Sequence, residues 1–238
     1  MLNYVVDPDI LAPFVPAGTE LDAWEGRTYV SLVGFRSLRT RVFGLPVPFH
    51  TDFDDVNLRF YVRRRVNGES RHGVVFIKEI VPRAAIAWVA RAIYREHFVA
   101  LPTHHAARLP YSGRPGEVVY GWRLGERWHE MSVEIVGEPS LQPPHSEAGF
   151  ITEHYWGYTR RPDGATSEYQ VQHPPWRVWR GVSAQLACDV TATYGERFAP
   201  FLGDRPNSAF VAEGSAVQVR LAETVGSKEG GVRSGREK

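Results

Sequence analysis

The sequence predicts a mainly β protein of the α+β class, in which two or three helices lie outside a barrel or sandwich of short strands. About ten short segments alternate apolar and polar side chains or are rich in β-branched and aromatic residues, the pattern of strands. Turn residues such as Asn-Gly and Asp-Gly separate several of them. Far fewer segments show the apolar periodicity of a helix.

The length and composition are those of one folded domain. The chain has 238 residues, of which 43% are hydrophobic and 23% charged, as is ordinary for a globular protein. We find no internal repeat or linker in the sequence and expect a single domain over residues 1–222. Residues 223–238 carry no apolar pattern and are expected to form a disordered tail.

Charge and hydropathy narrow the classes of partner. The net charge is +1 and the tightest basic run, Arg63-Arg64-Arg65, reads as a solvated strand end, so no nucleic-acid partner is expected. No apolar run approaches the roughly 18 residues of a membrane span, and the first residues lack the pattern of a signal peptide. The single cysteine, Cys188, suits a reducing compartment. We expect a cytoplasmic protein that binds a small molecule, and we consider self-association into a homo-oligomer.

The N-terminal segment combines a short helix with a strand. We expect Asp7 to cap a helix that has Pro8 at its first position and ends before Pro16. Residues 27–36 alternate and are rich in β-branched and aromatic side chains, which predicts a strand. Residues 44–55 are expected to form a loop.

A hairpin is predicted next. Residues 56–65 alternate between an apolar face and a polar face that carries Arg59 and Tyr61. A second strand is expected over 72–81. The intervening Asn67-Gly68 dipeptide is typical of a tight hairpin turn.

The middle of the chain is predicted to hold the longest helix. Residues 82–98 begin with a proline and repeat apolar residues at helical spacing. Three strands are then expected over 101–111, 117–125 and 127–137, followed by a proline-rich loop over 138–147.

Helices and strands alternate in the C-terminal part. Residues 148–160 are expected to begin as a short helix and to end as a strand that pairs with 165–173. A second helix is predicted over 189–202. A final hairpin is predicted over 208–221, around Glu213-Gly214-Ser215.

The sequence lacks the motifs of common cofactor and metal sites. It contains no G-x-G-x-x-G, P-loop, H-E-x-x-H, paired C-x-x-C or G-x-S-x-G, so we expect no cofactor and no metal. The adjacent His104 and His105 would point to opposite faces of a strand. They are therefore poorly placed to bind one metal together.

Lysine is rare, which draws attention to Lys78. It is the only lysine before Lys228. A desolvated lysine has a lowered pKa and can act as a Schiff-base nucleophile. The alternative, which we favour, is an exposed strand lysine beside Glu79.

An aromatic group near residue 155 has two interpretations. It spans "EHYWGYTR" and "HPPWRVW" and includes Tyr155, His173 and Trp176. Such rings line ligand pockets with a few polar tips. They are as often part of a core, so both interpretations stay open.

Six segments, in order, carry a resemblance to a known family. They are "LNYVVDPDILAPFVPAGTELDAWEGRTYVSLVGFR", "DDVNLRFYVR", "GVVFIKEIVPRAAIA", "ALPTHH", "ITEHYWGYTR" and "HPPWRVW". From Leu2 to about Leu221 the chain resembles the YqjF-like proteins, also called the DUF2071 family. That family is similar to acetoacetate decarboxylase. The resemblance implies an antiparallel β-barrel with a buried cavity and flanking helices.

The resemblance also locates a departure from the decarboxylase. There, a helix is followed by a Pro-Lys-Lys step that supplies the Schiff-base lysine, whereas this chain reads Pro102-Thr103-His104. Acetoacetate decarboxylation by the usual route is therefore not expected. With Thr103 at the reactive position, strand alternation points His105 into the cavity and His104 away from it.

The function expected from the sequence is a small-molecule-binding barrel, acting as a lyase or isomerase on an anionic or carbonyl compound without the Schiff-base lysine. His105 would be the general acid or base, and Arg59 and Tyr61 would bind a carboxylate or enolate. The alternatives are a non-catalytic ligand-binding or regulatory module and a Schiff-base enzyme centred on Lys78. The other residues expected to line the cavity are Thr103, His104, Lys78, Glu79, Tyr155, His173 and Trp176.

Overall fold

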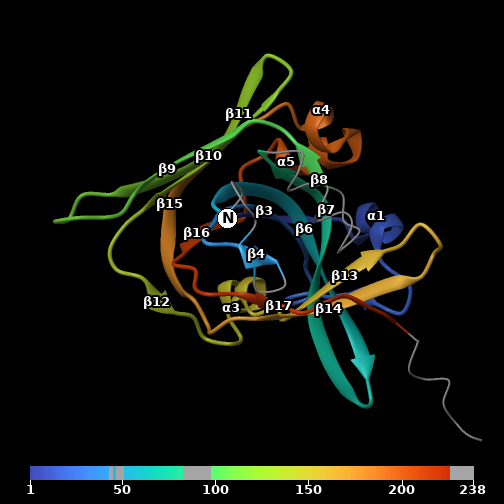
Figure 1. Ribbon diagram of the computed structural model, residues 1–238. Helices are drawn as coiled ribbons and strands as arrows, with labels where there is room; N and C mark the ends of the chain where they lie inside the picture. Colours follow the sequence, from blue (N-terminus) through green and yellow to red (C-terminus); the bar gives the residue numbers. More distant parts are fainter. Residues whose placement is uncertain (43–44, 47–50, 83–97, 226–238) are drawn as a thin grey trace, which may run out of the picture.

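Strands make up most of this protein, which we describe from a computed structural model (Figure 1). The structure describes residues 1–42, 45–46, 51–82 and 98–225. The longest predicted helix, over 82–98, falls almost entirely on residues 83–97, which lie outside the described residues.

The described chain contains many strands and a few short helices. The strands are β1 (Leu2–Val6), β2 (Glu20–Leu21), β3 (Thr28–Ser37), β4 (Arg41–Val42), β5 (Leu45–Pro46), β6 (Phe53–Val66), β7 (Glu69–Val81), β8 (Phe98–Ala100), β9 (Thr103–Arg108), β10 (Gly116–Leu124), β11 (Arg127–Ile135), β12 (Ser140–Leu141), β13 (Trp156–Arg160), β14 (Thr166–Gln172), β15 (Arg177–Ala187), β16 (Ser208–Ala212), β17 (Gln218–Val219) and β18 (Glu223–Thr224). The helical segments are α1 (Pro8–Leu11), η1 (Ala12–Phe14), α3 (Glu147–Thr152), α4 (Val190–Tyr194), η2 (Glu196–Phe198) and α5 (Ala199–Leu202). Among these described helices, none has the length and apolar character needed to cross a membrane.

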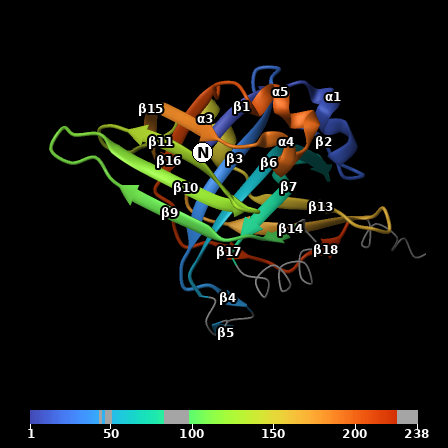
Figure 2. The ribbon, with the colours of Figure 1, turned by 90° about the horizontal axis from the view of Figure 1, so that it is seen from above.

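One 16-stranded sheet organises the molecule, in the order β17-β14-β13-β7-β6-β3-β1-β16-β15-β11-β10-β9. Both β13 and β8 run parallel to β7. Within the described chain, the path ends at β9 and β17 without a pairing between them, and Figure 2 shows β9 and β10 at one end and β13 and β14 at the other. The sheet is therefore mixed and open, in place of the predicted closed antiparallel barrel. Alternation predicts that strands exist but not which neighbours they pair with, and the closure came from the family resemblance alone.

Several local predictions are confirmed. The Asp7 side chain caps α1 by accepting from the Asp9 amide, and Pro8 occupies the first helical turn. The predicted hairpin is β6–β7, in which Asn67 and Gly68 connect the strands with φ angles of 51° and 86°. Two successive left-handed residues are what a type I′ hairpin turn requires.

Three segments of the C-terminal part differ from their predictions. Residues 208–221 do not form a hairpin, because β16 pairs with β1 and β15 whereas β17 pairs with β14. The helix expected over 189–202 is divided into α4, η2 and α5 at Gly195, whose φ of 97° is left-handed. The segment predicted as a disordered tail also begins with an ordered strand, since Glu223 and Thr224 pair with β14 as β18.

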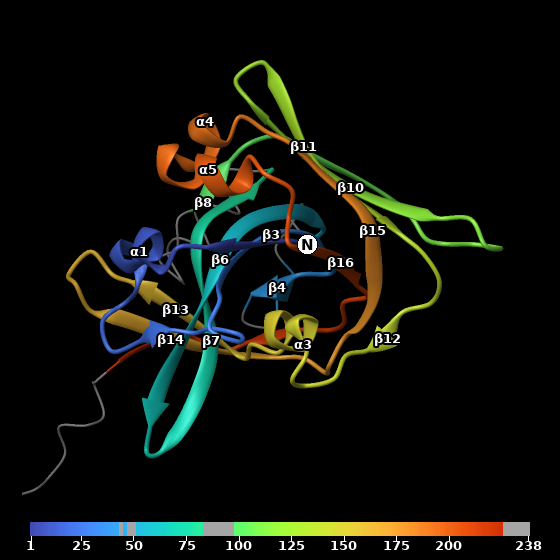
Figure 3. The same cartoon turned by 180° about the vertical axis from the view of Figure 1, so that it is seen from behind.

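The alternating side chains of β6 face two different cores. Val56, Leu58 and Phe60 belong to the larger core, which is covered by α4 and α5. Arg59 and Tyr61 point to the opposite face, where Tyr61 packs in a smaller core with Ile151 of α3. Figure 3 shows α4 and α5 on one side of β3 and β6, and α3 on the other.

Candidate functional site

The face of β6 beneath α3 is both polar and buried. Asn57 and Tyr61 are each 1% exposed, and Asn3 and Ser31 on the neighbouring strands are fully buried. Burying polar groups costs free energy unless they form hydrogen bonds. A polar layer inside a sheet core is therefore a candidate functional site.

A chain of hydrogen bonds runs through this layer. The Ser31 hydroxyl donates to Asn3 Oδ1 at 2.7 Å and lies 2.6 Å from the Tyr61 hydroxyl. Asn3 Nδ2 donates to Ser208 Oγ at 3.0 Å, and Ser208 in turn donates to the Glu147 carboxylate. Because Ser31 donates its only proton to Asn3, Tyr61 is the donor to Ser31. Every donor therefore points along the chain from Tyr61 towards Glu147.

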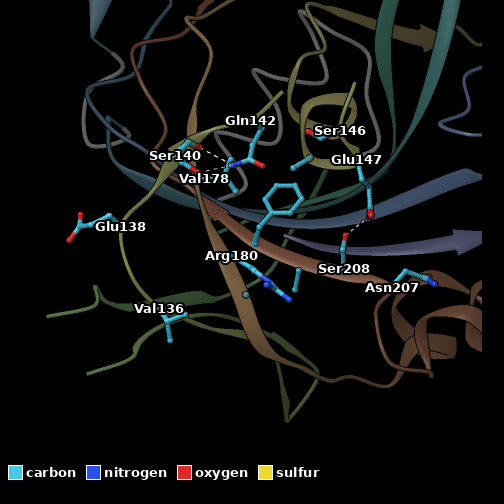
Figure 4. A pocket seen from close by; sticks show the side chains of 14 residues that line it. Val136, Glu138, Ser140, Gln142, Ser146, Glu147, Val178, Arg180, Asn207 and Ser208 are labelled. Carbon is cyan, nitrogen blue, oxygen red and sulfur yellow. Dashed lines mark hydrogen bonds between the residues drawn. The ribbon is translucent and has the colours of Figure 1, made fainter. Parts of the chain in front are cut away.

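The Glu147 end of this chain opens into a pocket. The pocket has a volume of about 560 Å³ and lies between α3, β12, β15 and β16. Figure 4 shows Glu147 and Ser208 joined across its wall, with Gln142 and Arg180 among its other polar side chains. The pocket is thus connected by hydrogen bonds to the buried Tyr61.

Arg59 lies beside Tyr61, at the end of this series of hydrogen bonds that is opposite Glu147. Its Nη2 donates to the Ile151 carbonyl at 3.2 Å, and its guanidinium carbon lies 5.7 Å from the centre of the Tyr61 ring. Its Nε is buried without a hydrogen bond. In the described part of the chain, Arg59 forms no ion pair with a carboxylate.

His154 also lies against the ring of Tyr61. Its ring centre is 4.6 Å from that of Tyr61 and 5.3 Å from that of Phe150. Both of its ring nitrogens are buried, and among the described residues neither has a partner at full hydrogen-bond geometry; the Ile151 backbone lies near the ring and acts to raise its pKa. Burial, reinforced by the positive charge of Arg59, lowers the pKa of His154 to about 3. The imidazole is therefore neutral at physiological pH.

A second histidine connects this region to the surface. His72 Nδ1 lies 2.5 Å from Asp22 Oδ2, and its ring centre is 6.4 Å from that of His154. The hydrogen bond to Asp22 raises the pKa of His72, against the opposing effect of burial. For Asp22, burial acts to raise the pKa, but the hydrogen bond and charge of His72 outweigh it, and the pKa is lowered. Among the residues that the structure covers, no group of three or more His, Cys, Asp or Glu side chains is placed to hold a metal ion.

Comparison with known families identifies the chain. The family model DUF2071, described as "Uncharacterized conserved protein (COG2071)", matches residues 1–216. The chain belongs to the DUF2071 family. No curated protein matches it.

Solved structures place this DUF2071 protein in the acetoacetate decarboxylase-like fold. The enduracididine biosynthesis enzyme MppR complexed with pyruvate has a TM-score of 0.57 at 16% identity, over 93% of this chain and 81% of its own. A structure from studies of acetoacetate decarboxylase has a TM-score of 0.61 at 13% identity, over 94% and 84%. The Legionella pneumophila acetoacetate decarboxylase has a TM-score of 0.54 at 12% identity, over 94% and 79%. These likenesses concern the fold.

The two adjacent histidines of this DUF2071 protein lie on opposite faces of β9, as predicted. His105 Nδ1 lies 2.8 Å from Asp54 Oδ1, whereas His104 Nε2 lies 3.0 Å from Glu130 Oε1 on the outer face. Thr103 begins β9 on the same face as His105.

The predicted proximity of His105 to Arg59 and Tyr61 is wrong. Asp54, the partner of His105, is on the other face of β6 from Arg59 and Tyr61. Asp54, Arg59 and Tyr61 are all on β6, so the sequence alone does not show which face of β6 His105 reaches. That face follows from the pairing of β9 with β10.

Lys78 and Glu79 also point to opposite faces. Lys78 donates to the Thr193 carbonyl of α4, with its ammonium 5.9 Å from the Tyr194 ring. Burial lowers its pKa. Glu79 is 5% exposed and lies opposite Asn57, on the face of the polar layer. Lys78 therefore does not face the polar layer beneath α3.

The predicted aromatic residues form a stack of their own. The ring of His173 lies 4.9 Å from Tyr155 and 4.1 Å from Trp176. Trp176 donates from its indole to Ser215 Oγ at 2.8 Å, and Tyr155 donates to Glu153. In the described residues, the ring contacts and hydrogen bonds of this stack do not include Tyr61.

The site also contains residues that sequence reasoning did not select. His154 was part of the aromatic group but was not singled out, and Asn3, Ser31 and Glu147 were not considered. Asn3 and Ser31 did leave a signal, because each is a lone polar residue within an apolar strand, "LNYVV" and "YVSLV". Such a residue in a buried strand must find a polar partner.

Proposed function

We propose that this DUF2071 protein binds a small organic carboxylate, with the Arg59 guanidinium as the partner of the carboxylate group. One observation carries the proposal. Arg59 is partly buried, its Nε has no hydrogen bond, and no described carboxylate forms an ion pair with it.

The physical argument rests on the cost of an uncompensated charge. A guanidinium withdrawn from water loses solvation, and proteins usually restore it with a carboxylate. A planar guanidinium binds a carboxylate through two parallel hydrogen bonds. Because Arg59 uses one of its N–H groups on the Ile151 carbonyl, it retains donors for a bound anion.

The comparisons support the class of ligand. MppR, which has a similar fold, is complexed with pyruvate, and two further neighbours are named for acetoacetate. Both compounds are small carboxylates that also carry a ketone. We use pyruvate as the probe for this reason.

Binding, rather than turnover, is the function that the geometry supports best. A general acid or base works best with a pKa near the operating pH, whereas the pKa of His154 beside Arg59 is lowered to about 3. Lys78, the alternative Schiff-base nucleophile, faces α4 instead. We therefore favour the ligand-binding module over the lyase or isomerase hypothesis.

The test is calorimetric titration of the whole chain with pyruvate. We expect wild-type protein to bind pyruvate and Arg59→Gln to bind at least about 10-fold more weakly, since a charge-assisted pair is lost. Arg63→Gln is the matched control, because Arg63 is on the same strand, its side chain is 39% exposed and it already forms an ion pair with Glu20. Absence of pyruvate binding to wild type, or equal affinity in folded Arg59→Gln, would refute the proposal.

A further inference from the structure

We infer that His154 recognises a second oxygen of the ligand, by donating a hydrogen bond from its neutral imidazole to a carbonyl oxygen next to the carboxylate that Arg59 binds. This inference rests on the proposed function. It narrows the ligand class from carboxylates in general to oxo carboxylates.

The first step of the argument is the arrangement around Tyr61. The guanidinium carbon of Arg59 is 5.7 Å from the Tyr61 ring centre, and the ring centre of His154 is 4.6 Å from it. Arg59 and His154 thus lie against the same aromatic ring. Arg59 Nη2 donates to the carbonyl of Ile151, three residues before His154, so both groups also meet at the C-terminal end of α3.

The second step is the unsatisfied hydrogen-bonding capacity of His154. The side chain is 6% exposed, and neither ring nitrogen has a partner at full hydrogen-bond geometry within the described chain, although the Ile151 backbone lies near enough to act on the pKa of the ring. Buried polar groups in proteins are nearly always paired. A neutral imidazole has one N–H donor and one bare nitrogen acceptor, so a carbonyl oxygen is a matching partner for the donor.

The third step is the charge state of His154. The charged and titratable groups that face it are Arg59, Asp22 and His72, together with the Tyr61 hydroxyl on β6. Burial, followed by the charge of Arg59, lowers its pKa to about 3, and Asp22 opposes this only in part. A carboxylate bound to Arg59 would offset the charge of Arg59, but burial, the largest cause of the lowered pKa, would remain. His154 therefore stays neutral and polarises the carbonyl without taking up a proton.

The consequence is discrimination between two ligands of nearly equal size. Pyruvate carries the second oxygen, whereas propionate has the same carboxylate and carbon count without it. A site built to hydrogen-bond a polar atom disfavours the analogue that lacks it, because the buried donor is then left unpaired. We expect wild-type protein to bind pyruvate about 10-fold more tightly than propionate.

The experiment titrates both ligands into wild type, His154→Phe and Arg59→Gln. His154→Phe keeps a ring against Tyr61 and removes the donor, so the preference for pyruvate should disappear while affinity for propionate is retained. Arg59→Gln should weaken both ligands. His173→Phe, in the aromatic stack elsewhere, is the control and should keep the preference. If His154→Phe does not fold, His154→Gln replaces it; because its amide is also a donor, it should keep part of the preference.

The outcomes separate the two proposals. If neither ligand binds to wild type, the proposed function fails. If both bind to wild type with equal affinity and Arg59→Gln weakens both, the carboxylate site stands and the role of His154 is refuted. Calorimetry of pyruvate in two buffers of different ionisation enthalpy, at about pH 7, should show no proton uptake. Uptake of one proton that is lost in His154→Phe would refute a neutral donor.

Discussion

His105 Nδ1 lies 2.8 Å from Asp54 Oδ1. The other ring nitrogen of His105 lies 3.2 Å from Arg36 Nη1. Because arginine only donates, Nε2 is the acceptor and the ring hydrogen of a neutral His105 faces Asp54. His105 thus connects edge strand β9 to both β3 and β6, and both of its nitrogens already have partners.

We predict that His105→Ala lowers stability and leaves pyruvate binding unchanged. The substitution removes the histidine partner of Asp54, whose side chain is only 12% exposed, and such a loss costs roughly 1–3 kcal/mol. Urea denaturation followed by circular dichroism measures this loss. His104→Ala is the control, because the exposed His104–Glu130 pair contributes about 0–1 kcal/mol. Loss of pyruvate binding with unchanged stability would instead restore His105 as the site residue that the sequence predicted.

We predict that the His72–Asp22 pair stabilises the protein more in mild acid than in alkali. The pKa of His72 is raised in the folded protein, so its contribution is fully present below the unfolded value of about 6.5 and is lost as pH rises through the folded value. The pKa of Asp22 is lowered, so its contribution is lost only in strong acid, as pH falls through the folded value.

Denaturation of wild type and His72→Gln at about pH 6 and about pH 9 tests this pair. The difference in unfolding free energy between the two proteins should be larger at the lower pH. His104→Gln, whose pair with Glu130 is exposed, serves as the control. A difference that is constant or grows with pH would contradict the assigned ion pair.

We predict the opposite pH dependence for His154. Its folded pKa of about 3 lies below the unfolded value, so only the unfolded chain takes up a proton as pH falls through about 6.5. Wild type should therefore lose about 2 kcal/mol relative to His154→Phe between about pH 6.5 and pH 4.5. Parallel stability curves for the two proteins would show that His154 is not held neutral.

We predict that Gly68→Ala destabilises the β6–β7 hairpin by about 1 kcal/mol, because an L-residue is strained at a left-handed φ. The φ of Gly68 is 86°. Thermal denaturation should show a fall of about 2–4 °C. Asn67→Gly at the preceding turn position should show little change, since glycine adopts a φ of 51° without strain. Equal effects of the two substitutions would argue against this turn geometry.

Local sequence patterns predicted the strands well and their partners poorly. Period-two alternation over 56–65 and an Asn-Gly turn are enough to define β6–β7. The pairing of Leu2 with Ala209 has no local signal, because it joins segments from opposite ends of the chain. The hairpin predicted over 208–221 failed for this reason.

The same limit applies to the candidate site. Arg59 and Tyr61 were predicted because a polar face on an otherwise apolar strand is visible in the sequence. His154 could not be matched to them, because it follows α3 and reaches Tyr61 only through packing. The alternation of β9 correctly predicted that His105 shares a face with Thr103. Which side chains of β6 meet that face depends on the pairing of distant segments.

The central position of β1 has a consequence for biosynthesis. β1 pairs with β3 on one side and with β16 on the other, where Leu2 is opposite Ala209. During translation, this edge of β1 has no native partner until the chain as far as Ala209 has left the ribosome. Unpaired edges of this kind are prone to association with other chains. Folding is therefore expected to finish after synthesis and slowly, as is typical when contacts join sequence-distant segments.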